Sequence, residues 1–164
     1  MRVIDDLAQT QLEQPTIVTI GSFDGLHIGH RHLLKQLIAH ARETHRLSAL
    51  ATFHPHPRSV LHPWLSPKVL TTPGEKVAIL EKWGLDILAL LSFTPELART
   101  SAGDFVQLLC QRLRMTELWV GPDFALGRRR EGNVSALRAM GEKWGFQVRV
   151  VSPFMLNGRP VSST

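Results

Sequence analysis

The chain has 164 residues, of which 43% are hydrophobic and 20% charged, and a formal net charge of +5. This is enough for one hydrophobic core, so we expect a single domain over residues 1–164. No apolar run approaches the roughly 18–20 residues of a membrane-spanning helix. The start at Asp5–Asp6 is unlike a signal peptide, and the one cysteine, Cys110, is typical of core packing in a reducing compartment. We therefore expect a cytoplasmic protein with no membrane partner.

The positive charge has two possible causes, a nucleic-acid partner or a small anionic substrate. The basic residues are scattered except for Arg128–Arg130, and the chain has no Tyr. A basic stripe with interleaved aromatic residues, which marks many nucleic-acid binders, is missing from the sequence. The sequence therefore favours a small anionic substrate and no nucleic acid.

The first half of the chain predicts two strands separated by a helix. Residues 16–20 are mostly branched apolar residues, which predicts a short buried strand. Over 31–45, leucine, isoleucine and alanine recur at helical spacing. A second strand is predicted over 47–53, and it ends at the breaker cluster 54–57, His-Pro-His-Pro.

The second half continues the alternation of helices and strands. Thr72 is predicted to cap a helix that has Pro73 in its first position and ends at Gly84. The further predicted elements are a strand over 86–93, a helix over 101–114 capped by Ser101, a strand over 117–120, a helix over 131–144 followed by Gly145, and a strand over 146–151.

Five strands separated by helices predict an α/β fold, with a five-stranded parallel sheet and helices on both faces. Ligands bind such sheets at the carboxyl ends of the strands. Clusters rich in Gly, Pro, His or Arg follow three of the predicted strands, at 21–30, 54–57 and 121–130. We therefore expect one ligand site at this edge of the sheet.

The segment 21–30 has the residues of a phosphate-binding turn. Its glycines let the backbone approach a ligand closely, and the helix that follows directs free N–H groups and its positive dipole end toward that ligand. His27 and His30, one helical turn apart, can donate to phosphate oxygens. For Asp24, capping the helix or bracing the turn explains the residue as well as a ligand contact does.

Four segments together resemble one known family. The pattern G-x-F-D-G-x-H-x-G-H at 21–30 resembles the signature of adenylyltransferases with a Rossmann-like nucleotidyltransferase fold. Residues 52–57 resemble the T-F-x-P-H-P segment of bacterial FAD synthetases, and 120–132 resemble their V-G-x-D-F-x-F-G-x-x-R-x-G segment. Residues 161–164 resemble the start of their I-S-S-T-x-I-R motif. The chain thus resembles the FMN adenylyltransferase (FAD synthetase) domain of bacterial bifunctional riboflavin kinase/FAD synthetases.

The resemblance implies transfer of AMP from ATP to FMN, giving FAD and pyrophosphate. His27 and His30 are then the catalytic residues that bind and polarise phosphate oxygens, and no base or covalent intermediate is needed. Mg²⁺ would bridge the substrate phosphates with few or no protein ligands. The eight histidines form no convincing zinc site, so no protein-held metal is expected.

The resemblance also implies two sets of binding residues. The ATP-binding set comprises Gly21, Ser22, Phe23, Asp24, His27, Gly29, His30, Arg128, Ser163 and Thr164. The flavin-binding set comprises Phe53, His54, Pro55, His56, Pro57, Asp123 and Phe124. Structural explanations stay open for several of them: a strand-ending turn at 54–57, a loop cap and a core residue at 123–124, a solvated face at 128–130, and a tail or helix cap at 162–164.

The chain departs from the family pattern in three ways. Leu126 replaces an aromatic residue, which would loosen a wall of the flavin site. The last motif stops at Thr164, before its arginine, and the kinase module of about 120–150 residues, to which such a domain is normally fused, is not in this sequence. Two rival functions remain: a related nucleotidyltransferase acting on phosphopantetheine or nicotinate mononucleotide, and an inactive module that binds a nucleotide or flavin.

Overall fold

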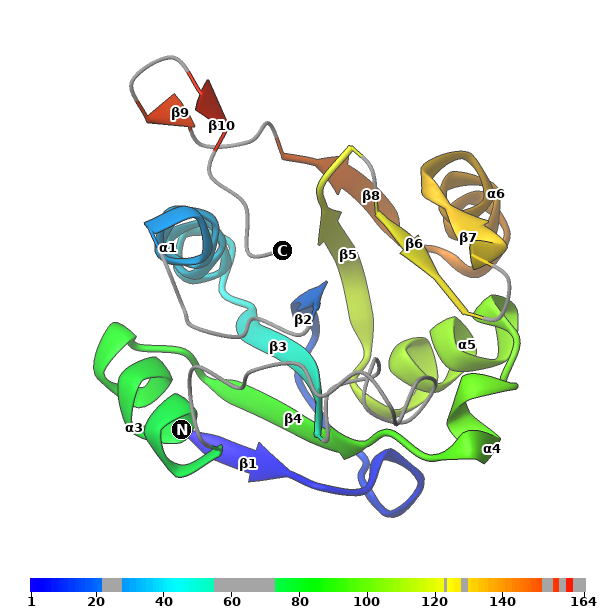
Figure 1. Ribbon diagram of the computed structural model, residues 1–164, viewed down its shortest axis with the longest axis horizontal. Helices are drawn as coiled ribbons and strands as arrows, with labels where there is room; N and C mark the ends of the chain where they lie inside the picture. The colour runs from blue at the N-terminus through cyan, green and yellow to red at the C-terminus, as the bar shows by residue number, and fades with distance from the viewer. Residues whose placement is uncertain are drawn as a thin grey trace.

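The computed structural model describes residues 1–21, 28–54, 73–122, 124–127, 130–151, 155–156 and 159–160. Its centre is a six-stranded sheet in which every pair of neighbouring strands is parallel (Figure 1). The strands lie in the order β1-β4-β3-β2-β5-β8. Their bounds are β1 Arg2–Ile4, β2 Thr16–Ile20, β3 Leu47–His54, β4 Ile87–Ser92, β5 Met115–Val120 and β8 Gln147–Val150.

Helices cover both faces of the sheet (Figure 1). The helical elements are the 3₁₀ helix η1 (Leu7–Gln9) and the α-helices α1 (Ile28–Glu43), α3 (Pro73–Trp83), α4 (Pro95–Ala98), α5 (Ala102–Arg112) and α6 (Val134–Trp144). Alternate residues of β2 show how the faces divide. Ile17 packs with Leu37 of α1, whereas Val18 belongs to the cluster that contains Phe105 of α5.

The strand order creates a switch point between β2 and β5. Without the edge strand β1, the remaining strands run 3-2-1-4-5 in chain order, which is the order of a doubly wound Rossmann-like sheet. The chain leaves β2 toward β3 on one side and later returns to β5 on the other side. Connections therefore diverge at the carboxyl end of β2, and this divergence leaves room for a ligand.

The predicted α/β fold is confirmed, with one strand more than expected. The central sheet has six strands because Arg2–Ile4 pairs with β4, and the sequence analysis did not identify this segment. It is only three residues long and buries Ile4 alone, so it carries almost no periodic signal. The predicted strand over 16–20 coincides with β2, whose residues are all buried.

The helix predicted over 131–144 starts later than expected. Residues Gly132–Asn133 form β7, which pairs antiparallel with β6 (Ala125–Leu126), and α6 begins only at Val134. The Asn133 side chain accepts the N–H of Ala136 and so caps α6. A short antiparallel pair, β9 (Met155–Leu156) with β10 (Arg159–Pro160), was also not predicted.

The predicted helix caps agree with the structure where the structure describes them, whereas α1 begins at Ile28, three residues before its predicted start, and ends at Glu43, two residues before its predicted end. Ser101 caps α5 by accepting the N–H of Asp104 at 3.1 Å. Gly84 follows α3 and Gly145 follows α6, both with positive φ, as expected for glycines that end helices. The predicted cap Thr72 lies outside the described residues. In the part of the chain that is described, no helix has the length and apolar character needed to cross a membrane.

Cys110 lies on α5 and packs against the hydrophobic core, as the sequence predicts. Burial raises the pKa of its thiol to about 11. Only about one thiol in 10³ is then ionised at pH 8, so we expect iodoacetamide to label the folded protein very slowly. Mass spectrometry of the labelled chain, with a urea-unfolded sample as the control, measures this. Equal labelling of both samples would contradict the burial of the thiol.

Candidate functional site

The carboxyl ends of β2, β3 and β5 lie side by side. Gly21 directly follows β2, and its N–H donates to the carbonyl of Ala51 in β3 at 3.1 Å. The register places Thr19 of β2 opposite Trp119 of β5, so Gly21 and Gly121 leave the sheet at the same level. The structure therefore brings the predicted clusters to one edge as far as they are described, namely at Gly21, His54 and Gly121.

Helix α1 begins at this edge with a first turn suited to an anion. This turn contains no acidic residue, and it includes Gly29 and His30. The exposed Arg31 follows immediately, at the helix end where a positive charge is unfavourable for the helix itself. A bound anion would offset that cost, because it interacts favourably with both the helix dipole and the guanidinium group.

Many of the predicted site residues cannot be placed. Of His30 and Gly29 only the position in α1 is described. Outside the described residues lie Ser22, Phe23, Asp24, His27, Pro55, His56, Pro57, Asp123, Arg128, Ser163 and Thr164. Their roles remain predictions.

Phe53 and Phe124, two predicted flavin contacts, are partly buried against the core. The Phe53 ring lies 5.6 Å from the Phe93 ring in an edge-to-face arrangement and 6.0 Å from the ring of Phe105. The next residue, His54, is exposed at the end of β3. This arrangement gives Phe53 a packing role and leaves its contact with a flavin a prediction.

The segment after β5 forms a hairpin that contacts the start of α5. A carboxylate oxygen of Glu131 accepts the backbone N–H of Ala102 at 2.9 Å. Gly127 and Gly132 lie so close to Ala102 that a Cβ at either position would come within 2.9 Å of it. The sequence analysis did not identify Glu131 as a site residue. In the sequence, Glu131 could have been noticed as an acidic residue that lies between Gly127 and Gly132.

A hollow of about 650 Å³ lies at the same edge of the sheet, beyond β4. Its lining comprises Asp5, Asp6, Leu7, Ala8, Leu91, Ser92, Thr94, Glu96, Leu97, Thr100, Phe105 and Leu108. A hydrogen bond with its own backbone at the start of α4, together with one from Thr94, lowers the pKa of Glu96. Glu96 is therefore ionised at neutral pH. Because three carboxyl groups surround it, the hollow is unsuited to a phosphate, which fits better at the start of α1.

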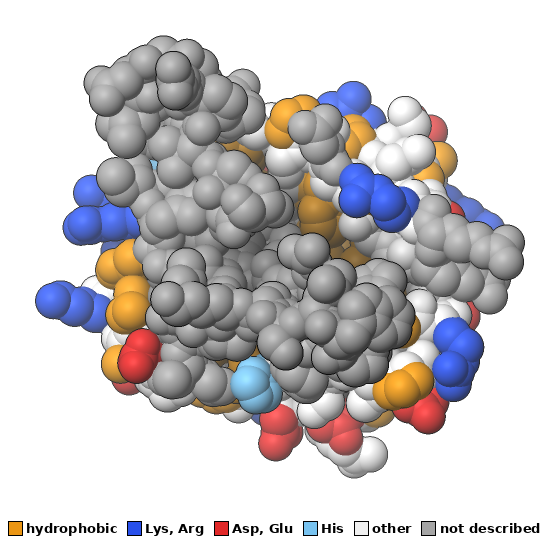
Figure 2. Space-filling view, in the orientation of Figure 1, with side chains coloured by type: hydrophobic (Ala, Val, Ile, Leu, Met, Phe, Trp, Pro, Cys, Tyr) orange, Lys and Arg blue, Asp and Glu red, His pale blue; other side chains and the backbone are white. Residues whose placement is uncertain are grey.

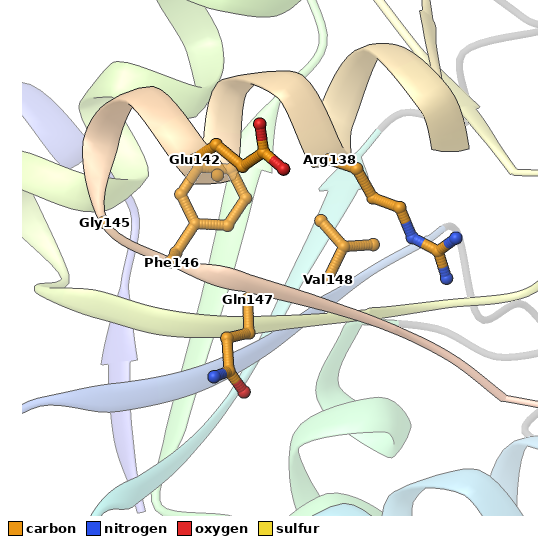
Figure 3. A pocket seen from close by; sticks show the side chains of 7 residues that line it. Arg138, Glu142, Gly145, Phe146, Gln147 and Val148 are labelled. Carbon is orange, nitrogen blue, oxygen red and sulfur yellow. The ribbon is translucent and has the colours of Figure 1, made fainter.

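A second hollow, of about 580 Å³, lies away from this edge. Figure 3 shows Arg138 and Glu142 of α6 above Phe146 and Val148, near the start of β8. It therefore lies toward the amino end of β8, opposite the edge where ligands bind parallel sheets. We do not assign it to the site. In Figure 2 the described Lys and Arg side chains are spread around the rim of the molecule and form no single patch on this face.

A buried group of charged side chains connects β5 to the far end of α1. The Glu117 side chain is 8% exposed, forms an ion pair with Arg46 and lies 3.2 Å from Nε2 of His40. It also accepts the indole N–H of Trp119 at 3.2 Å. Burial raises the pKa of Glu117, but the hydrogen bonds from Trp119, Arg46 and His40 and the charge of Arg46 outweigh it, so the net shift is downward.

In the described part of the chain, no three His, Cys, Asp or Glu side chains come together as a metal site. Glu117 lies three residues before the end of β5 and Arg46 lies just before β3, so this ion pair is set back from the carboxyl edge and we assign it to packing.

Comparisons with known proteins agree on one family. A family model described as FAD synthetase matches residues 9–164. A bifunctional riboflavin kinase/FMN adenylyltransferase of Buchnera aphidicola subsp. Schizaphis graminum is 32% identical over 156 residues, which cover 94% of this chain and 50% of that protein. The protein of the same name from Escherichia coli (strain K12) is 33% identical over 165 residues, covering 100% and 52%. The chain thus spans about half the length of these curated relatives.

A solved structure with a similar fold covers nearly the whole chain. It is described as a macrolide-efflux protein from Streptococcus pneumoniae. It matches with a TM-score of 0.83 and 23% identity, covering 98% of this chain and 52% of that one. At this identity the match shows a shared fold and nothing about activity.

Proposed function

The chain belongs to the FAD synthetase family, and on this premise we propose that residues 1–164 transfer AMP from ATP to FMN, giving FAD and pyrophosphate. The observation that carries the proposal is the extent of the family match. It spans residues 9–164 and so includes the three segments that follow β2, β3 and β5. The match also confirms the family predicted from the sequence.

In the proposed reaction an oxygen of the FMN phosphate attacks the α-phosphorus of ATP. A new P–O bond forms, the bond between the α-phosphorus and the bridging oxygen breaks, and pyrophosphate leaves with the electron pair. The attacking phosphate is already anionic at neutral pH, so no base is needed. The protein then acts by holding the two substrates in line and by stabilising charge on the α-phosphate and on the leaving group.

The start of α1 supports this assignment for the phosphates. Its backbone N–H groups, with His27 and His30 as side-chain donors, would contact oxygens that gain negative charge in the transition state. Ser163 and Thr164 are proposed as further donors, and Arg128 as a cation for the phosphates. The first turn of α1, which has no acidic residue, is the structural feature in favour.

Mg²⁺ is part of the proposal as a substrate-bound ion. Bound to ATP, it would neutralise charge on the phosphates, and it keeps most of its ligands as water or phosphate oxygens. Gly21 and the first turn of α1, near which the phosphates are proposed to bind, bring no carboxylate among the residues described there. Because these described residues offer no carboxylate, an ion bound there would be held mainly by the substrate.

The flavin is proposed to bind at the ends of β3 and β5. Residues 53–57 begin in the last two residues of β3 and 123–124 follow β5, and these two strands flank β2 on its two sides. A ligand that reaches both segments therefore crosses the carboxyl end of β2, where the phosphates are proposed to lie. In this proposal the FMN phosphate would lie next to ATP.

The relatives carry a second activity in their names, riboflavin kinase. We propose that residues 1–164 form one domain that supplies adenylyl transfer alone, and that the kinase belongs to the part of those proteins that this chain does not match. Cys110, the one cysteine of this sequence, packs against the core as is typical in a reducing compartment, so we place the reaction in the cytoplasm.

The test is a comparison of three acceptors. With ATP and Mg²⁺, the chain is expected to convert FMN to FAD and to leave nicotinate mononucleotide and phosphopantetheine unchanged, as measured by chromatography of the products. Adenylylation of either alternative acceptor at a higher rate would place the chain in another nucleotidyltransferase branch. Binding of FMN in calorimetry without any product would instead support an inactive flavin-binding module.

A further inference from the structure

The hairpin β6–β7 closely approaches Ala102, the first residue of α5. Gly127 and Gly132 flank the turn of the hairpin, and both contact Ala102. A Cβ at Gly127 would lie 2.7 Å from the Ala102 nitrogen, and one at Gly132 would lie 2.7 Å from the Ala102 Cβ. Larger residues at these positions would separate the hairpin from the helix. The close approach of the hairpin to Ala102 thus depends on glycine at positions 127 and 132.

Glu131 provides the polar part of this contact. Ala102 is fully buried, and its N–H is one of the donors that a helix start leaves without a partner in the helix. Ser101, the residue that caps α5, accepts the N–H of Asp104, whereas Glu131 accepts the N–H of Ala102 at 2.9 Å. A carboxylate at this end of a helix also interacts favourably with the helix dipole.

A series of close contacts leads from this point back to the edge of the sheet. The N–H of Phe124 donates to the carbonyl of Gly121, and the N–H of Arg130 donates to the carbonyl of Gly127. Between these two turns, β6 pairs with β7. The described residues of 121–133 are therefore fixed at one end by β5 and at the other by Ala102.

We propose that Glu131 is a positioning residue for this substrate-binding segment. It holds the hairpin against helix α5, and it thereby sets the place of the described residues of 121–130 at the carboxyl end of β5. This inference rests on the proposed function, because it assumes that residues 123–124 and 128 contact the substrates. Glu131 itself need not touch either substrate.

The test compares three variants at Glu131 with a matched control. Glu131→Ala removes the acceptor, Glu131→Asp keeps the charge but is one methylene shorter, and Glu131→Gln keeps both the length and an acceptor oxygen. Ser101→Ala is the control, because it removes another hydrogen bond from the start of α5 without touching the hairpin. Steady-state kinetics for FMN and ATP are measured well below the melting temperature of each variant.

We expect kcat/KM for FMN to fall about tenfold or more in Glu131→Ala and Glu131→Asp, mainly through KM. A shift of the segment by 1 Å is enough to cost up to about 10²-fold. Glu131→Gln should stay within about threefold of the original chain. Ser101→Ala should lower the melting temperature and leave KM unchanged.

Two results would overturn the inference. One is an unchanged KM in Glu131→Ala, and the other is an equal change in Ser101→Ala, which would show a general effect of a weakened α5. If the unmodified chain forms no FAD, the proposed function fails separately. Calorimetric binding of FMN to the same variants then decides the role of Glu131, since equal dissociation constants would contradict it.

Discussion

Replacing His27 or His30 by alanine is expected to slow FAD formation by about 10²–10³-fold. Each imidazole is proposed to donate a hydrogen bond to phosphate oxygens whose negative charge grows in the transition state. Loss of one such donor costs roughly 2.7–4 kcal/mol of transition-state stabilisation. The measurement is kcat for FAD formation at saturating ATP and FMN, compared with that of the unmodified chain.

The two substitutions are not expected to be additive. Both histidines would act on the same phosphates, and residues that act as a unit lose most of their effect when the first is removed. The double variant His27→Ala/His30→Ala should therefore be little slower than the slower single variant. A multiplicative loss would instead show that the two imidazoles stabilise charge at independent places.

His32→Ala is the matched control for these variants. His32 lies on α1 two residues after His30, and its Nε2 is 3.3 Å from the side-chain amide nitrogen of Gln36. Residues two positions apart do not face the same way on a helix, so this variant should keep nearly full activity. Unchanged turnover in both His27→Ala and His30→Ala would exclude their proposed role. A large drop in melting temperature without a specific rate loss would show that they serve the core.

The sequence predicts well those strands that are long and buried on both sides. Residues 16–20 and 47–53 are mostly apolar, the first lying between Pro15 and Gly21 and the second ending before His54, and the structure has β2 and β3 there with at most one residue of difference. Caps also have local signals, as at Ser101 and Gly145. The strand β1 has no such signal, because its place depends on pairing with β4, more than 80 residues away.

In the candidate site, too, contacts between residues far apart in the sequence have no local signal. Topology alone predicts that segments following neighbouring parallel strands meet at one edge, and Gly21, His54 and Gly121 lie there. The contact between Glu131 and Ala102 joins residues 29 positions apart, and no periodic pattern specifies it. The late start of α6 has the same cause, since pairing of Gly132 with Leu126 in β6 competes with the helix for this residue.

The largest expected effect on stability comes from Glu117→Gln. Gln keeps the shape and an acceptor for Trp119, but it leaves the Arg46 guanidinium, which is 17% exposed, without its carboxylate. Breaking a buried ion pair by removing one partner costs about 3–5 kcal/mol, and the partial exposure of Arg46 favours the lower value, about 3 kcal/mol. For a chain of this size, that corresponds to a melting temperature lower by roughly 6–12 °C.

The matched control is Glu81→Gln. Glu81 is 63% exposed and lies 3.8 Å from the N-terminal amine, an arrangement worth at most about 1 kcal/mol. Urea unfolding of both variants and of the unmodified chain at pH 7 gives the free energies of unfolding. If Glu117→Gln lowers the free energy of unfolding by no more than Glu81→Gln does, the proposed contribution of the buried ion pair to stability is contradicted.

The loss of stability caused by Glu117→Gln is expected to become smaller as the pH falls. The folded state lowers the pKa of Glu117 below its ordinary value of about 4.5, so the carboxylate stabilises the fold fully above that value. This stabilisation is lost as the pH falls through the lower pKa of the folded state. The difference in unfolding free energy between the unmodified chain and Glu117→Gln should thus be constant from pH 7 to about pH 5 and shrink below pH 4.5. A difference that grows on acidification would mean that the protonated carboxyl of Glu117, rather than its ion pair with Arg46, stabilises the fold.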